Sequence, residues 1–267
     1  MAVGPSAGQG GGPAAVYLTS DGGSSWTLGA LPSLPSVLYD VTCPTTDHCV
    51  AVGESPADNA STGVIFTSAD GGHSWTAHSV PGASQQLDSI SCASTTTCMA
   101  VGEDVAGSVG TSVVTTDAGA TWSTRPLPAG TPPLNAVSCP STSRCVAVGA
   151  NPDGSVSSIV ALSTSDLGAT WSAGTLSAPQ VQLDAVACWS SEDCIAGGSN
   201  TVDLAGEAVV TTDGGATWSS STLPTAAPPL AALTCPAAKT CLGVGTVGAN
   251  PATGAALATD DGGTTWR

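Results

Sequence analysis

The side chains of this sequence that are best suited to chemistry are its carboxylates. Its 267 residues include 20 Asp and Glu but only 4 Lys and Arg, which gives a formal net charge of −16. Two carboxylates about 5–10 Å apart can hydrolyse a glycosidic bond, one as the acid and the other as the base or nucleophile. Clustered carboxylates can also bind a cation. The candidates to line such a site are Tyr39, Glu54, Asp88, Glu103, Asn135 and Asp184.

The same charge balance excludes several classes of protein. Four scattered cations cannot form the basic stripe with which nucleic-acid-binding proteins displace phosphate counterions, and they cannot hold an anionic membrane surface. No run of 18 apolar residues is present, so we expect no membrane insertion. The sequence also lacks the G-x-S-x-G, H-E-x-x-H, P-loop and dinucleotide-binding fingerprints, and we predict no cofactor.

One octet with the pattern S/T-x-D-x-G-x-S/T-W occurs six times, at Trp-to-Trp steps of 49, 47, 49, 47 and 48 residues. We expect its Asp to accept hydrogen bonds from the backbone N–H groups two and three residues further on. The following Gly supplies a positive φ, and the Trp enters the core between repeats. A calcium loop needs six to eight oxygens, whereas each octet offers one carboxylate, so we assign these residues to structure: Asp21, Asp70, Asp117, Asp166, Asp213, Asp261, Trp26, Trp75, Trp122, Trp171, Trp218 and Trp266.

The ten cysteines form five pairs with the same C-x5-C spacing, and they keep the period of the octets. Each pair suits a disulfide across a β-hairpin, because facing Cα atoms about 4.5–5.5 Å apart fall in the disulfide range. Structural zinc sites usually use C-x2–4-C spacing, so we predict no metal. The expected bonds are Cys43–Cys49, Cys92–Cys98, Cys139–Cys145, Cys188–Cys194 and Cys235–Cys241. Disulfides place the protein outside the cytosol, extracellular or in the cell envelope.

Each period of about 48 residues contains four short runs rich in Val, Ile and Thr and bounded by turn residues, which predicts four strands. In one repeat these are Leu38–Cys43, Cys49–Gly53, Val64–Thr67 and a strand that starts at Trp75. Four strands per repeat predict an all-β fold, a β-propeller in a single domain over 1–267. The approximate blades are 1–35 (partial), 36–84, 85–131, 132–180, 181–227 and 228–267 (partial).

The two ends of the sequence fall inside repeats. Met1–Gly4 has the same sequence as Met99–Gly102, which places Met1 in the second strand of a blade without its first strand or Cys pair. Arg267 follows the last octet Trp, before a fourth strand has room to form. We therefore expect about six blades with the first and last incomplete, a possible fragment of a six- or seven-bladed ring.

The candidate site residues occupy repeated positions. Tyr39, Asp88, Asn135 and Asp184 stand four residues before the first Cys of their repeats, where we expect the innermost strand to begin. Glu54 and Glu103 belong to the predicted loops between second and third strands. These positions can ring a channel mouth and bind a cation or a carbohydrate. The alternative is that they are solvated turn formers and strand caps.

The octet resembles the Asp-box, or bacterial neuraminidase repeat, of sialidase-like propellers. The whole blade also resembles those of Ycf48-like photosystem II assembly factors, and its C-P-x4-C-V-A-V-G unit those of secreted actinobacterial propellers. Sialidases hold their substrate with three arginines, and this sequence has only Arg125, Arg144 and Arg267, of which Arg144 lies in a Cys loop and Arg267 directly follows the last octet. The resemblance therefore implies the fold and argues against sialidase activity.

Together these observations predict an extracellular binding or scaffold β-propeller without a recognisable catalytic constellation. We expect a protein or carbohydrate ligand at the loop rim or channel mouth, no nucleic acid, and a monomer. The alternative is a glycoside hydrolase of the Asp-box propeller type that uses a carboxylate pair.

The cysteine assignment predicts the thiol content of the purified protein. Each disulfide closes a small ring and contributes about 2 kcal/mol in the entropic model. Alkylation of the unreduced, aerobically purified protein followed by mass spectrometry should add no label, and reduction should expose ten thiols. Ten alkylatable thiols before reduction would refute the pairing.

Overall fold

A computed structural model describes residues 1–5, 14–32, 37–57, 60–82, 85–104, 106–150, 159–177, 181–200, 205–247 and 253–267. In these ranges the chain is all-β, as predicted, and every regular element is a strand. None of the described segments forms a helix long and apolar enough to cross a membrane. The chain divides into two compact units, Met1–Pro126 and Leu127–Arg267, and each contains three blade-like sheets.

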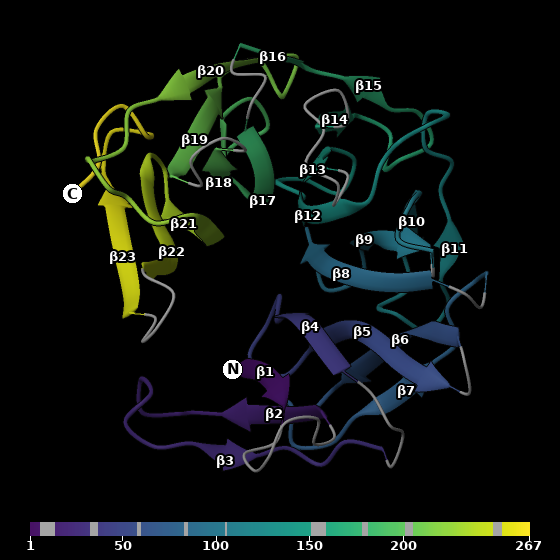
Figure 1. Ribbon diagram of the computed structural model, residues 1–267. Coiled ribbons are helices and arrows are strands. Elements are labelled where there is room, and N and C mark those ends of the chain that lie inside the picture. Colours follow the sequence, from purple (N-terminus) through teal and green to yellow (C-terminus); the bar gives the residue numbers. More distant parts are fainter. Residues whose placement is uncertain are drawn as a thin grey trace. The chain divides into compact units, whose positions relative to one another are not determined.

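The first unit contains one sheet of three strands and two sheets of four strands (Figure 1). In chain order the three sheets are antiparallel and each strand pairs with the next. Their strands are β1 (Ala2–Pro5), β2 (Ala14–Leu18) and β3 (Thr27–Leu28); β4 (Val37–Thr42), β5 (Cys49–Ala57), β6 (Ala60–Ser68) and β7 (Thr76–His78); and β8 (Gln85–Cys92), β9 (Cys98–Asp104), β10 (Gly110–Thr115) and β11 (Ser123–Thr124).

The second unit repeats this arrangement in sheets of four, five and three strands. The extra strand of the five-stranded sheet is β16, which pairs in parallel with β20. The strands are β12 (Leu134–Ser138), β13 (Cys145–Gly149), β14 (Val160–Thr164) and β15 (Ser172–Ala173); β16 (Thr175–Leu176), β17 (Val181–Cys188), β18 (Cys194–Asn200), β19 (Gly206–Thr211) and β20 (Thr217–Ser221); and β21 (Leu230–Ala237), β22 (Thr240–Val247) and β23 (Thr253–Thr259).

The predicted strands are confirmed, but the second and third strands of two blades extend further than expected. The sequence predicts Glu54 in a loop, whereas it lies in β5, paired with Gly63 of β6. Glu103 likewise lies in β9, paired with Gly110 of β10. The physical reason is that the two strands continue as a ribbon beyond their apolar part, which keeps their backbone N–H and C=O groups hydrogen-bonded.

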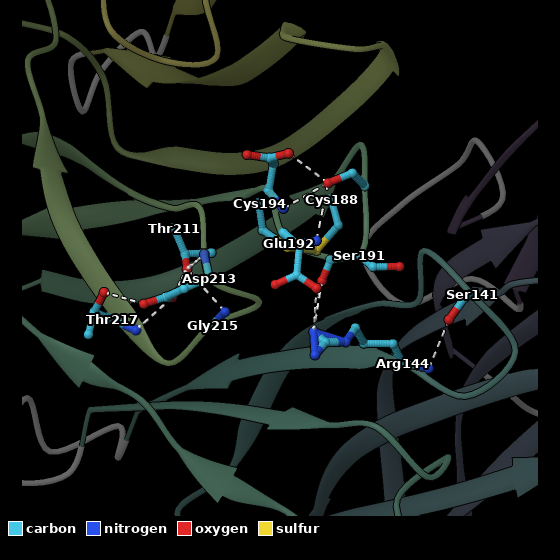
Figure 2. A network of polar contacts seen from close by, with 12 residues as sticks. Ser141, Arg144, Cys188, Ser191, Glu192, Cys194, Thr211, Asp213, Gly215 and Thr217 are labelled. Atoms are coloured by element: carbon cyan, nitrogen blue, oxygen red, sulfur yellow. Dashed lines mark hydrogen bonds and ion pairs between the residues drawn. A yellow bond between two sulfur atoms is a disulfide. The ribbon is translucent and has the colours of Figure 1, made fainter.

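Each octet forms the turn after the third strand of its blade, and in the first five it leads into the fourth strand; Figure 2 shows the one that ends at Trp218. Thr217 donates its backbone N–H to Oδ1 of Asp213 at 2.9 Å and its hydroxyl to Oδ2 at 2.6 Å. Thr211 donates its hydroxyl to Asp213 at 2.8 Å and accepts the N–H of Gly215 at 3.0 Å. The same four bonds recur in the other five octets.

This geometry corrects the predicted hydrogen bonds of the octet Asp. The carboxylate binds the N–H four residues further on, not two or three. The reason is that the hydroxyl of the first octet residue already accepts the N–H of the Gly that stands two residues after the Asp. The predicted positive φ is present at all six of these glycines, between 78° and 92°. The Asp-box identity of the octet remains a prediction.

The octet Trp packs between blades of the same unit in four of the six repeats, at Trp75, Trp122, Trp218 and Trp266. In the first unit, Trp75 lies in a cluster with Val16 and Leu18 of the blade before it. In the second unit, Trp218 lies against Val146 and Val148 in the same way. Within each unit, a blade thus covers one face of the blade that follows it, which is how single blades of a repeat protein bury their apolar surface.

Trp26 contradicts the prediction that every octet Trp enters the core, because 47% of its surface is exposed. It belongs to the first blade, and in the first unit the covering residues of each later Trp come from the preceding blade. Its indole N–H nevertheless has a partner, the carbonyl oxygen of Gly23 at 3.1 Å. The indoles of Trp75, Trp122 and Trp218 bind the equivalent glycine carbonyl.

All five predicted disulfides are present, and each closes the hairpin between the first and second strands of a blade. Their Cα–Cα distances are 4.0–4.1 Å, and in two blades the two cysteines are directly paired residues of the ladder. No described cysteine is free. Five such bonds suggest an oxidising, extracellular environment.

The octet turns predict an acid-sensitive fold. Hydroxyl and backbone donors from the residue four positions on lower the pKa of five octet Asp side chains to about 2, from an ordinary 3.8. A carboxyl group with a lowered folded-state pKa stabilises the fold above its unfolded pKa and loses this contribution as the pH falls through the folded one. Thermal stability should therefore decrease between pH 3.8 and about 2.

The Asp213→Asn variant tests this origin, because Asn has no second oxygen for the Thr217 hydroxyl. Its melting temperature should be lower than that of the wild type at pH 7, and the difference should shrink toward pH 2. Asp260→Asn, at an exposed carboxylate paired with Arg267, is the matched control. Equal melting temperatures of the Asp213→Asn protein and the wild type at pH 7 would show that the turn does not depend on the carboxylate.

Candidate functional site

A β-bulge places the candidate residue of every innermost strand. The ladder between first and second strands skips one residue at the same point in five blades, and the skipped residues are Tyr39, Asp88, Asn135, Asp184 and Ala231. The sequence predicts these positions at strand starts, and Asn135 is the second residue of β12 as expected, whereas β4, β8 and β17 begin earlier and place Tyr39, Asp88 and Asp184 further inside the strand. Bulges leave one residue outside the regular alternation and redirect its side chain.

A glycine in the second strand faces each bulge. A Cβ atom on it would overlap a backbone carbonyl oxygen of the innermost strand, for example that of Val37 in front of Gly53. The five glycines are Gly53, Gly102, Gly149, Gly198 and Gly245. The close approach of the two backbones therefore requires glycine, and this explains the A-V-G ending of the second strands.

In the first unit the structure brings four of the six candidates together. Tyr39 donates its hydroxyl to Oε1 of Glu54 at 2.6 Å, from a bulge to the neighbouring strand of the same blade. Asp88 accepts a hydrogen bond from Nε2 of Gln86 at 2.8 Å. Gln86 lies in β8, and its paired residue in the neighbouring strand β9 of the same blade is Glu103. We call Tyr39, Glu54, Asp88 and Glu103 the carboxylate cluster.

The charges within the carboxylate cluster act on one another. Burial raises the pKa of Asp88, and the charge of Glu54 raises it further. Burial also raises the pKa of Glu103, with added contributions from Asp88, Asp104 and Glu54. Burial and the bond to Glu54 raise the pKa of Tyr39, so this phenol stays protonated and donates. Like charges that act on one another disfavour the ionised forms, and a bound cation would relieve that repulsion.

In the second unit the structure joins the other two candidates. Asn135 donates from Nδ2 to the carbonyl oxygen of Leu183 at 2.9 Å and to Oδ1 of Asp184 at 3.2 Å. Gln182 also donates to that Asp184 oxygen at 3.3 Å. Burial raises the pKa of Asp184. These bonds link the innermost strands β12 and β17 and engage the side-chain amide of Asn135 and one carboxylate oxygen of Asp184. This pair therefore has fewer polar atoms left for a ligand than the carboxylate cluster.

Asp40 is a structurally important residue that sequence reasoning missed. Its Oδ2 accepts the hydroxyl of Ser89 at 3.0 Å and the backbone N–H of Ile90 at 2.9 Å, and its Oδ1 accepts the N–H of Val41 at 2.8 Å. Burial raises the pKa of this carboxyl group. The bonds tie β4 to β8 immediately after their bulges, and they hold Tyr39 and Asp88 in place. The only sequence sign was an acidic residue where the other repeats have Ser or Ala.

The described residues of the cluster suit an organic cation. In the described part of the chain, no group of three or more His, Cys, Asp or Glu side chains is arranged to hold a metal ion. A phenol ring with 41% of its residue exposed lies beside carboxylates that repel one another. This combination can attract an ammonium or guanidinium group by charge and by contact with the ring face.

Comparison with known proteins identifies the fold. No protein-family model matches the chain, and no curated protein matches it. Solved structures do. A Ycf48 structure described as bound to D1 peptide aligns with 17% identity over 88% of this chain and 81% of that one, with a TM-score of 0.56. YCF48 from Cyanidioschyzon merolae aligns with 16% identity over 88% and 86% of the two chains, with a TM-score of 0.55.

The chain is a β-propeller. The similarity extends to a GH74 xyloglucanase from Xanthomonas campestris, with 13% identity, a TM-score of 0.64, and coverage of 96% of this chain but 42% of that one. Identities this low establish the propeller fold and no shared activity, because the same fold carries many functions. The function of this propeller must therefore be argued from its own residues.

The carboxylate cluster predicts a measurable coupling between Asp88 and Glu103. Asp88→Asn removes a neighbouring negative charge, so the pKa of Glu103 should fall toward its ordinary value of 4.5. Carbonyl-detected NMR titration of the Glu side chains measures this shift. Asp193→Asn, in the other unit, should leave the Glu103 titration unchanged. Identical Glu103 titrations in the wild type and the Asp88→Asn protein would show that the two groups do not interact.

Proposed function

We propose that this β-propeller is an extracellular or cell-envelope binding module that captures a protein ligand through a Lys or Arg side chain at the carboxylate cluster. The observation that carries the proposal is the convergence of Glu54, Asp88 and Glu103 around Tyr39, with raised pKa values at Asp88 and Glu103. Unbound, these groups repel one another. A cationic side chain exchanges that repulsion for charge-assisted hydrogen bonds.

The arrangement of Tyr39 supports a side-chain ligand. Its hydroxyl is held by Glu54, so the ring is oriented before a ligand arrives, and preorganisation lowers the cost of binding. The ring can then contact a guanidinium face while the carboxylates accept its N–H groups. The net charge of −16 would steer a basic partner toward the protein at low ionic strength.

The structural neighbours agree with a binding role. The Ycf48 structure is described as bound to a peptide, so a propeller of this kind can present a peptide-binding surface. From this similarity we infer for this chain only that its ligand is a peptide or protein. The charge complementarity, and therefore the basic character of the peptide, comes from this chain's own carboxylates.

A second candidate is glycoside hydrolysis by two carboxylates of the cluster. The raised pKa values of Asp88 and Glu103 favour it, because a general acid must keep its proton near the working pH. The fold similarity to the GH74 xyloglucanase makes xyloglucan a reasonable test polysaccharide. Release of reducing sugar that Glu103→Gln abolishes would establish this activity, and no release would exclude it for this substrate.

Fluorescence anisotropy with a labelled Arg- and Lys-containing peptide tests the binding function. The double variant Glu54→Gln/Glu103→Gln should weaken binding by about tenfold or more, since each charge-assisted bond contributes about 1.5–3 kcal/mol. Binding should also weaken with rising salt and as the pH falls through the raised pKa values of Asp88 and Glu103.

The control is Glu192→Gln/Glu207→Gln, which also removes two Glu charges but in the other unit, where Glu192 pairs with Arg144 and Glu207 accepts a hydrogen bond from Asn200. It should bind the peptide like the wild type. If the double variant and the control lose affinity equally, the peptide binds through net charge and the proposed cluster is wrong.

A further inference from the structure

The seams between neighbouring blades differ at one residue that follows the octet. We call a seam the place where the chain leaves the fourth strand of one blade and passes the octet turn of the next blade. The residue three positions after the octet Trp lies at this place. In the four seams within the two units it is Gly29, His78, Gly174 or Ser221. Its size therefore sets how closely the two backbones can approach.

In the two seams with glycine, the backbone of one blade lies directly against the octet turn of the next. A Cβ atom on Gly174 would overlap the carbonyl oxygen of Gly215, and Gly29 has the same restriction. In both seams the next residue donates its backbone N–H to a carbonyl oxygen of the turn. These bonds are 2.9 Å long and run from Ala30 to His73 and from Thr175 to Ala216.

The seam with serine is closed by a side chain. The hydroxyl of Ser221 donates to the carbonyl oxygen of Gly263 and accepts the indole N–H of Trp266 at 3.0 Å. A short polar side chain at this position can thus join two blades across the gap that its own Cβ atom creates.

His78 leaves the seam between the second and third blades open. Its Nε2 lies 2.7 Å from Oγ1 of Thr67, which belongs to the same blade and packs against Gly119 of the next octet. By repeat position, the closing bond would join the N–H of Ser79 to the carbonyl oxygen of Ala120, and this bond is absent. Among the described residues, neither of these two backbone groups has another hydrogen-bond partner.

A pocket of about 340 Å³ lies at this open seam, which is within the size range of small-molecule sites. No charged side chain belongs to its described lining, although the protein carries a net charge of −16. The lining residues are His78, Ser79, Pro81, Ala120, Thr121 and Trp122. The pocket therefore suits an uncharged ligand.

The lining matches a secondary amide next to a hydroxylated ring. Such an amide presents its C=O and N–H on opposite sides, so it can accept from Ser79 and donate to Ala120, as an inserted peptide group would. Pro81 and Trp122 offer apolar surface to a methyl group and to the apolar face of a sugar ring. Burial lowers the pKa of His78, so the imidazole is neutral at pH 7, and its Nδ1 can bond a ligand hydroxyl.

We propose that this pocket binds an N-acetylated sugar, whose acetamido group bridges the backbones of Ser79 and Ala120 and whose ring lies against Trp122. Sugar hydroxyls both donate and accept, which suits the imidazole of His78 and the hydroxyl of Ser79. The amide replaces the contact that closes the two glycine seams. The site shares no residue with the carboxylate cluster and does not depend on its function.

Two trisaccharides with the same β-1,4-linked backbone test the role of the acetamido group. Triacetylchitotriose carries an acetamido group on each ring, and cellotriose has a hydroxyl there. In two-dimensional ¹H–¹⁵N NMR titrations, triacetylchitotriose should shift the resonances of the Ser79 backbone N–H and the Trp122 indole N–H. Cellotriose should bind about tenfold or more weakly, because it cannot form the two amide hydrogen bonds.

His78→Gly is the decisive protein variant, because it gives this seam the residue of the two glycine seams. The N–H of Ser79 should then bond to the carbonyl oxygen of Ala120, and its hydrogen exchange should slow. Binding of triacetylchitotriose should weaken by about tenfold or more. The melting temperature should stay within about two degrees of the wild type, since the new bond offsets the added backbone freedom.

The matched control is His73→Gly, which replaces an exposed histidine of the same unit outside the pocket. It should bind triacetylchitotriose like the wild type.

Three outcomes would overturn the proposal. Equal affinities for the two trisaccharides would show that the acetamido group is not recognised. Unchanged binding by His78→Gly would place the sugar elsewhere on the protein. Binding of acetyl-triglycine amide as tight as that of triacetylchitotriose would make the ligand a peptide. The Glu54→Gln/Glu103→Gln protein should bind triacetylchitotriose like the wild type, so this pocket and the carboxylate cluster succeed or fail separately.

Discussion

The contact on which the rest of the site depends is the close approach of two backbones between the first and second strands of five blades. A carbonyl oxygen of the innermost strand lies where the Cβ atom of any residue but glycine would stand on the second strand. This approach forms a bulge in the innermost strand, and the bulge turns one side chain away from the regular alternation. Tyr39 and Asp88 owe their placement to it.

Two further devices hold each blade around this contact, and both are local in sequence. A disulfide closes the hairpin between first and second strands at one end. An octet turn closes the connection between third and fourth strands, with the Asp carboxylate collecting a hydroxyl and an N–H from the residue four positions on. Both stabilise a blade that has no large apolar core of its own. The apolar clusters are formed between neighbouring blades.

The distribution of charge separates the scaffold from the site. The six octet carboxylates are satisfied by neighbouring donors, and this lowers their pKa values. Asp88 and Glu103 have the opposite shift because burial and like charges act on them without a cationic partner among the described residues. A carboxylate therefore closes a turn in one place and lies buried beside other negative charges in another, and only the surroundings distinguish the two.

Much of this protein follows from its sequence alone. The period of about 48 residues, the five Cys pairs and the strand order within a blade are set by short-range patterns, because turns, hairpins and disulfides between near neighbours depend on local residues. Tertiary structure alone decided which octet Trp is covered, that Glu54 and Glu103 lie in strands, and that Asp40 ties two bulges together. These features depend on contacts between residues about 50 positions apart. Because the repeats are similar in sequence, the sequence does not show which residues of two blades will be in contact. The packing of one blade against the next determines those contacts.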